Sequence, residues 1–129
     1  MIAFISSAYR GPNVFVEQDN ARIAQALCLL AMAQCHTPFA SHLLYTQFLD
    51  DHNPKHRENG IQCCREMLLR SSVMYVYAPH TGTSKGVQGD LQAAQGENVE
   101  VITVTADDLR PYLEQIRPSR LYARIFGEQ

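Results

Sequence analysis

The sequence of 129 residues has no tryptophan, no long apolar run and no large excess of charge of one sign. No run approaches the about 18 apolar residues that a membrane-spanning helix needs, so we expect no membrane partner. Lys and Arg number 11 against 13 Asp and Glu, and this balance excludes a broad basic face for a nucleic-acid polymer. The apolar start at residues 1–5 is shorter than the core of an export signal, so we expect a cytoplasmic protein.

Cysteine is scarce, and its spacing does not indicate a metal site. The four cysteines are Cys28, Cys35, Cys63 and Cys64. The last two are adjacent, whereas zinc ligands typically follow a CxxC spacing. Thiols of a cytoplasmic protein stay reduced. We therefore interpret all four as structural thiols buried in the core.

The remaining composition is that of a folded globular protein, with 46% hydrophobic and 19% charged residues. Domains cluster at about 100–150 residues, and a chain of this length buries enough surface to fold without disulfides or metals. No internal repeat, low-complexity segment or linker divides the sequence. We expect one domain over residues 1–129.

Apolar runs alternate with helical periodicity along the chain. The expected strands are residues 2–5, 37–41, 73–77 and 99–104, and the expected helices are residues 16–35, 57–70, 85–95 and 107–116. In the second helix we expect Ile61, Cys64 and Leu68 to face inward. The alternation predicts a three-layer α/β/α sandwich of the flavodoxin or Rossmann type, with a mostly parallel sheet of four to five strands. The tail at 119–129 is apolar enough to pack against a second chain.

Ligands of such sheets bind beyond the carboxyl ends of the strands, where three loops are expected. The first (6–13) carries Arg10 and Gly11, and the third (79–85) ends at Ser84 and Lys85. An arginine can grip a phosphate through two hydrogen bonds, and hydroxyls at a helix start can cradle an anion. Loops of this composition are also common structural turns, so the pattern alone leaves both interpretations open.

Asp90 lies one helical turn after Gly86, where its side chain can reach back towards the strand ends. A carboxylate beside an anion site is suited to glycosyl transfer, because it can attack a sugar carbon that develops positive charge. The alternative is an ordinary helix-surface aspartate, a residue type that the first turns of helices favour.

The second loop (42–55) contains His42, Asp50, Asp51 and His52. These side chains could suggest a metal site, but they lack the helical HxxxH spacing, and no metal is expected. His42 directly follows a predicted strand and is better interpreted as a hydrogen-bonding group that faces a ligand. The two aspartates can equally begin the turn that leads to Pro54.

Three segments make the sequence resemble a known family: residues 6–11 (SSAYRG), 20–22 (NAR) and 38–51 (PFASHLLYTQFLDD). They are similar to small bacterial and phage proteins that look like nucleoside 2-deoxyribosyltransferases and deoxynucleoside 5′-monophosphate N-hydrolases. The resemblance covers about residues 2–104. It implies a small-molecule nucleotide or nucleoside as substrate, no cofactor, and a homodimer or higher homo-oligomer in which a partner chain helps to close the site.

The resemblance also implies roles for individual residues. The enzymes' motif of Ser or Asp, one residue, Gly, three residues and a nucleophilic Glu falls on Ser84, Gly86 and Asp90. The expected phosphate-binding residues are Ser7, Arg10, Gly11, Ser84 and Gly86. The expected catalytic residues are Asp90 as nucleophile and Tyr9 beside the sugar, and the expected base-binding or sugar-binding residues are His42 and Gln47.

The sequence departs from these enzymes at two places. Asp90 stands where they have Glu, and residues 75–79 (YVYAP) lack the carboxylate that they place at the end of the third strand. The first hypothesis is therefore an enzyme that cleaves or transfers an N-glycosidic bond. The second is a protein that binds a nucleotide or an ADP-ribose-like molecule without turnover, and the third is a structural or interaction protein.

Overall fold

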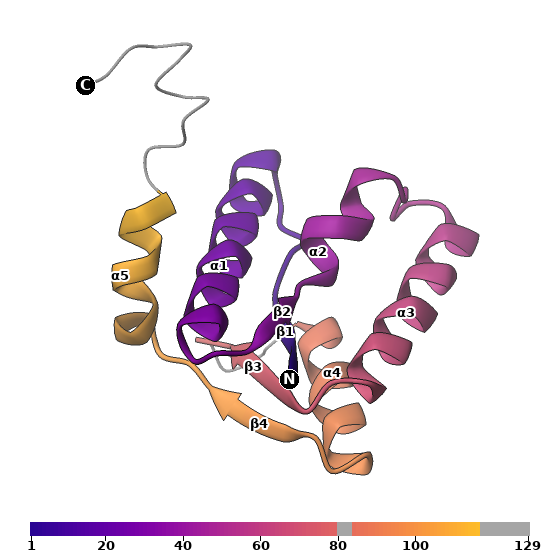
Figure 1. Cartoon of the computed structure of the whole chain (residues 1–129). Helices are drawn as coiled ribbons and strands as arrows, with labels where there is room; N and C mark the ends of the chain where they lie inside the picture. Colours follow the sequence, from indigo (N-terminus) through magenta and orange to yellow (C-terminus); the bar gives the residue numbers. More distant parts are fainter. Residues whose placement is uncertain (80–83, 117–129) are drawn as a thin grey trace.

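The computed structural model describes residues 1–79 and 84–116 and forms an α/β fold (Figure 1). In chain order the elements are β1 (Ile2–Ser7), α1 (Val14–Ala33), β2 (Thr37–Phe39), α2 (Ser41–Leu44), η1 (Tyr45–Gln47), α3 (Pro54–Leu69), β3 (Val73–Tyr77), α4 (Lys85–Gly96), β4 (Glu100–Thr103) and α5 (Ala106–Ile116). The predicted alternation of strands and helices is confirmed. In the described part of the chain, no helix has the length and apolar character needed to cross a membrane.

The four strands form one parallel sheet in the order β2-β1-β3-β4. β1 and β3 lie at its centre, with Ile5 opposite Tyr75 and Ser7 opposite Tyr77. The chain leaves β1 towards β2 on one side, whereas β3 and β4 follow on the other. The carboxyl ends of β1 and β3 therefore frame the switch point at which ligands bind in open parallel sheets.

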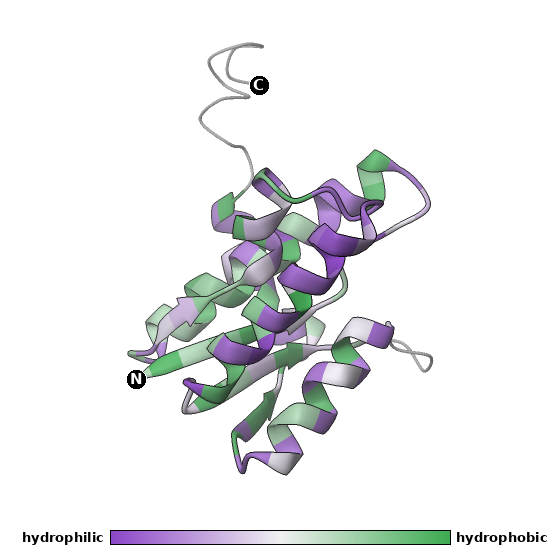
Figure 2. Cartoon of the chain, turned by 90° about the vertical axis from the view of Figure 1, so that its right-hand side faces the viewer, coloured by the Kyte–Doolittle hydropathy of each residue, from purple (hydrophilic) through white to green (hydrophobic). Residues whose placement is uncertain are grey.

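Helices cover both faces of the sheet, as the sandwich prediction required. Side chains alternate between the faces along a strand. Ala3 and Ile5 face the cluster that packs on α1 and α5, whereas Phe4 faces the cluster that packs on α3 and α4. Figure 2 shows the strands largely in green between helices that carry many purple residues. The same alternation places Ser6 and Ser7 of β1 on opposite faces of the sheet.

The prediction of a loop over residues 42–55 is wrong for much of that segment. The chain forms the short helix α2 and the 3₁₀ turn η1, so His42 lies in a helix, and α3 begins at Pro54. Asn53 caps α3, because its side-chain oxygen accepts hydrogen bonds from the backbone N–H groups of Lys55 and His56 at 3.0 and 3.3 Å. The pair Asn53 and Pro54 therefore marks a helix start, with proline in the first turn.

Two expectations about the core are also wrong. Ile61 is 52% exposed, while Leu68 of the same helix is buried. Cys35 and Cys63 are exposed, and only Cys28 and Cys64 are half-buried, although all four thiols are free. Burial raises the pKa of the Cys28 thiol to about 11, which keeps it protonated. The apolar tail at 119–129 and most of the third loop, residues 80–83, lie outside the described residues.

Candidate functional site

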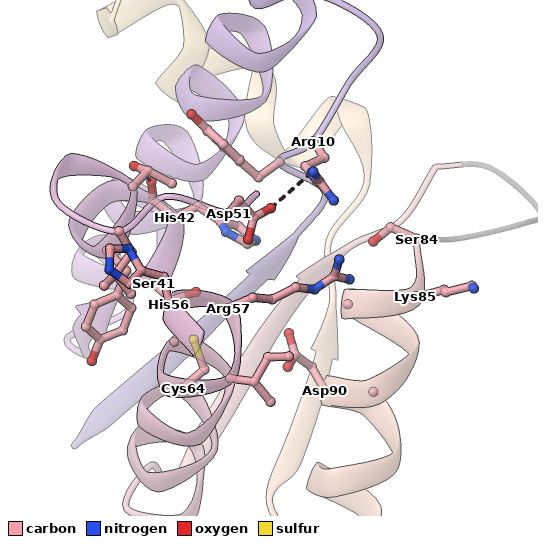
Figure 3. A pocket seen from close by; sticks show the side chains of 18 of the residues that line it. Arg10, Ser41, His42, Asp51, His56, Arg57, Cys64, Ser84, Lys85 and Asp90 are labelled. Atoms are coloured by element: carbon pink, nitrogen blue, oxygen red, sulfur yellow. Dashed lines mark hydrogen bonds and ion pairs between the residues drawn. The ribbon is translucent and has the colours of Figure 1, made fainter. Parts of the chain in front are cut away.

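A cavity of about 720 Å³ lies at the carboxyl end of β1 (Figure 3). Its walls come from the residues after β1, from the segment that runs from α2 to α3, and from the first turns of α4. The sheet topology places it near the predicted switch point. Its volume is in the range of about 300–1,000 Å³ that is usual for pockets that bind small molecules.

Asp90 lines this cavity, and a buried serine of β1 holds its side chain in place. The Ser6 hydroxyl donates a hydrogen bond of 2.7 Å to the Asp90 Oδ2. Ser6 is 1% exposed and lies two residues after Phe4 on β1, so it shares the face of Phe4 and points towards α4 rather than α1. Among the described residues, no hydrogen bond engages the second carboxylate oxygen, Oδ1. One oxygen is thus fixed and the other is available to a ligand.

The electrostatic surroundings of Asp90 act in opposite directions. Burial raises the pKa of the Asp90 carboxyl, whereas the Ser6 hydrogen bond and the nearby Arg65 guanidinium lower it. Burial is the largest effect, so the net shift of this pKa is upward from 3.8. The carboxylate is therefore more basic than a surface aspartate.

Tyr9 and His42 form a stacked aromatic pair on the cavity wall, with ring centroids 5.3 Å apart and planes inclined by 22°. The His42 Nε2 lies 3.0 Å from the carbonyl oxygen of Ser7, which can only accept a hydrogen bond, so Nε2 carries the proton. Burial lowers the pKa of His42 and favours the neutral ring. The neutral ring then presents an unprotonated Nδ1. The bond also joins α2 to the end of β1.

Arg10 lies in the segment after β1 and Asp51 in the segment after η1. Their side chains form an ion pair, with 3.0 Å between the Arg10 Nε and the Asp51 Oδ2. Both side chains are about half exposed, at 48% and 53%. Ion pairs with this exposure contribute only about 0–1 kcal/mol, so an anionic ligand can compete with Asp51 for the guanidinium. Arg10, which the sequence analysis expects to bind phosphate, lines the cavity and has a carboxylate partner there.

The start of α4 supplies the opposite wall. Ser84 caps the helix, because its hydroxyl oxygen accepts a hydrogen bond from the Val87 N–H at 3.3 Å. A Cβ atom on Gly86 or Gly89 would meet nothing within 4 Å, so the cavity-facing side of the first turns is open. A ligand can therefore approach this helix terminus and its positive dipole end.

The structure brings most of the predicted site residues to one cavity. Those that line it are Tyr9, Arg10, His42, Ser84, Gly86 and Asp90. Ser7, Gly11 and Gln47 do not line it. Ser7 lies opposite Tyr77 in the sheet, and among the described residues nothing bonds its buried Oγ. A Cβ atom on Gly11 would lie 2.5 Å from the Val16 Cγ1, so packing against α1 accounts for this glycine.

Sequence reasoning missed several residues that line the cavity, and it missed Ser6, which bonds the cavity-lining Asp90. Ser6 could have been found, because strand alternation puts it on the opposite face from Ser7. Arg57, Cys64 and Arg65 come from α3, and their seven- and eight-residue spacing places them on one helical face. No loop motif marks that face. None of the described His, Cys, Asp and Glu residues form a group of three or more that could hold a metal ion.

Two comparisons with known proteins bear on this site. A family model described as Domain of unknown function (DUF7768) matches residues 1–104. The match contains the whole sheet and every residue that lines the cavity. A comparison with the curated proteins found no match.

Proposed function

The chain belongs to the family described as Domain of unknown function (DUF7768), and this description names no activity. We therefore propose a function from the chemistry of the cavity. The protein binds a (deoxy)nucleotide there and cleaves or transfers its N-glycosidic bond, with Asp90 as the nucleophile. The observation that carries this proposal is the Asp90 carboxylate, with Oδ2 fixed by Ser6 and Oδ1 available in a cavity that also contains cationic side chains.

The proposed step follows from that geometry. The Asp90 Oδ1 attacks the anomeric carbon, the bond from this carbon to the base nitrogen breaks, and its electron pair leaves with the base. Water or a second base then displaces the carboxylate from the sugar, and the proton that this nucleophile loses neutralises the departed base. The stacked Tyr9 and His42 rings provide a flat surface for the sugar or base. Ser84 and Gly86, at the start of α4, lie where a 5′-phosphate would be bound.

The resemblance to nucleoside 2-deoxyribosyltransferases and deoxynucleoside 5′-monophosphate N-hydrolases supports the same assignment. Residues from the two segments that carry it, 6–11 and 38–51, line this cavity. Ser84, Gly86 and Asp90, which match the enzymes' motif, line its opposite wall. The aspartate has one methylene less than the glutamate of those enzymes. The hydrogen bond from buried Ser6 supports a catalytic Asp90 by fixing the shorter side chain.

The test is release of free base from a panel of deoxynucleoside monophosphates, followed by chromatography. We expect release by the wild-type protein and a loss of at least about a hundredfold in Asp90→Asn, which keeps the shape of the side chain but removes the nucleophile. Asp19→Asn, on the exposed face of α1, is the matched control and retains activity. No release by the wild type, or equal release by Asp90→Asn, would refute the assignment.

A second candidate is binding of a nucleotide or ADP-ribose-like ligand without turnover. It is favoured by the carboxyl end of β3, where Tyr77 and Ala78 occupy the region in which the resembling enzymes have a carboxylate. Calorimetry separates the two candidates. Tight binding that persists in Asp90→Asn, with no product formed by either protein, supports a binding protein.

A further inference from the structure

We propose that Arg57 is a specificity-determining residue that binds the phosphate group of the substrate and selects a nucleoside 5′-monophosphate over the free nucleoside. This inference rests on the proposed nucleotide-binding function and assigns a residue outside the motifs that suggested it. Arg57 lies in the first turns of α3, and Figure 3 shows its side chain pointing across the cavity towards the start of α4.

The first argument is the charge balance of the cavity. Four permanent cations line it, namely Arg10, Arg57, Arg65 and Lys85. Arg10 pairs with Asp51, and Arg65 lies close enough to Asp90 to lower its pKa. Within the described part of the chain, Arg57 and Lys85 have no carboxylate partner. The walls formed by α3 and α4 therefore each present one uncompensated positive charge, which is suited to an anionic ligand.

The second argument is the distance from the nucleophile. Lys85 precedes Asp90 by five residues on α4, which corresponds to about 7–8 Å along the helix axis. Arg57 precedes Arg65 by eight residues on α3, or about 12 Å. Figure 3 shows the Arg57 and Lys85 side chains at one level of the cavity and Asp90 at another. A sugar whose anomeric carbon meets Asp90 would direct its 5′ substituent towards the first level.

The third argument is the geometry of the guanidinium group. Arginine can donate two parallel hydrogen bonds to a phosphate, whereas the Lys85 ammonium acts as a point charge. Arg10 is paired with Asp51 and Arg65 lies near Asp90, so among the described residues Arg57 is the cavity arginine with no carboxylate beside it. The carboxylates Glu17, Asp50 and Asp51 also line the cavity. They oppose a polyanionic chain and favour a ligand with one compact anionic group.

The test compares binding of the four deoxynucleoside 5′-monophosphates and the four deoxynucleosides by calorimetry. We expect the wild type to bind at least one monophosphate more tightly than its nucleoside. In Arg57→Gln the affinity for that monophosphate should fall roughly 10- to 100-fold, as loss of a charge-assisted hydrogen bond implies. The affinity for the nucleoside should change by less than about threefold, because the uncharged ligand does not use the same bond.

Arg70→Gln is the matched control, because Arg70 caps the same helix and pairs with Glu66 on its exposed surface. It should bind all ligands like the wild type. Arg57→Lys should recover part of the lost affinity, since it keeps the charge but not the planar fork. Circular dichroism and thermal melting check that each variant is folded. Because Arg57 is exposed on the surface of α3, we expect its variants to fold like the wild type.

Four results would overturn the inference. They are an unchanged monophosphate affinity in Arg57→Gln, an equal loss for nucleosides and monophosphates, equal wild-type affinity for the two ligand classes, and no binding of any probe. Base release is measured separately in the same samples. A wild type that binds monophosphates through Arg57 but releases no base supports the inference and refutes the proposed activity.

Discussion

Two adjacent serines of β1 have different surroundings. Ser6 faces α4 and bonds to Asp90, whereas the Ser7 side chain has no bonding partner among the described residues and only its backbone carbonyl contacts His42. The resemblance implied a role for Ser7, but the period of two along a strand brings Ser6 to the carboxylate. The sequence contained this information, because Phe4 and Ser6 share a face by spacing alone.

Ser6→Ala should slow base release roughly 10- to 100-fold. The variant loses a hydrogen bond to a charged group and with it the fixed orientation of Asp90. The same bond lowers the pKa of Asp90, so its removal raises this pKa further. Because the nucleophile must be ionised, the acidic limb of the pH–rate profile should move to higher pH. Initial rates across a pH series measure both effects.

Ser7→Ala is the counterpart of Ser6→Ala and distinguishes the structure from the expectation based on resemblance. It removes a hydroxyl that does not line the cavity, so the rate and the acidic limb should both stay as in the wild type. If Ser7→Ala were the more damaging variant, Ser7 would be the serine that contacts the substrate, and the role given to Ser6 would be wrong.

At the scale of elements, α3 is the part that sequence reasoning described least well. Its apolar residues do not form one inward stripe, since Ile61 is exposed and Leu68 is buried. The helix packs on α4 and contributes one wall of the cavity, so its inner face carries Arg57 and Cys64 in addition to apolar side chains. Periodicity predicts faces that are buried in a core, but not faces that line a ligand cavity.

The four strands were predictable for the opposite reason. Both faces of β1 and β3 are covered by helices, so these strands are continuous apolar runs bounded by polar residues. The order β2-β1-β3-β4 was not specified by any local pattern, because it depends on where each helix crosses over the sheet. The sequence therefore predicted the layers, but not the short helices that replace the second loop or which cations meet across the cavity.

Asn53→Ala tests how far the site depends on the start of α3. The variant loses the side-chain oxygen that accepts from Lys55 and His56, and such a loss costs about 0.5–2 kcal/mol. We expect a lower melting temperature and, because Arg57 lies in the next turn, weaker binding of monophosphates. Asn59→Ala, within the same helix, lacks a capping role and should not lower stability. Equal stability of the two variants would show that the cap is unimportant.

At the scale of the whole molecule, the family match and the fold have different limits. The match ends at residue 104, yet α5 follows and completes one of the two apolar clusters. Leu109 of α5 is 1% exposed and packs with Ile5 and Leu27. The element that follows the match therefore contributes to the core on the face opposite the cavity, while every residue that lines the cavity lies within the match.

Two large aromatic side chains that are close in sequence to cavity-lining residues remain exposed. Phe15 is 73% exposed and lies two residues before the cavity-lining Glu17, and Phe48 is 61% exposed next to the cavity-lining Leu49. Exposed aromatic residues are enriched at protein interfaces. They support the expectation from the resemblance that a second copy of this chain packs near the site and helps to close it.

Light scattering coupled to size exclusion tests this arrangement on the full chain. We expect a homodimer, and we expect the double variant Phe15→Ser and Phe48→Ser to be monomeric at the same concentration. Because the partner would close the cavity mouth, the monomer should also bind monophosphates more weakly. Met32→Ser is the control, since Met32 is 59% exposed at the other end of α1 and should leave the dimer intact. A monomeric wild type, or a dimer unaffected by the double variant, would place the site within one chain.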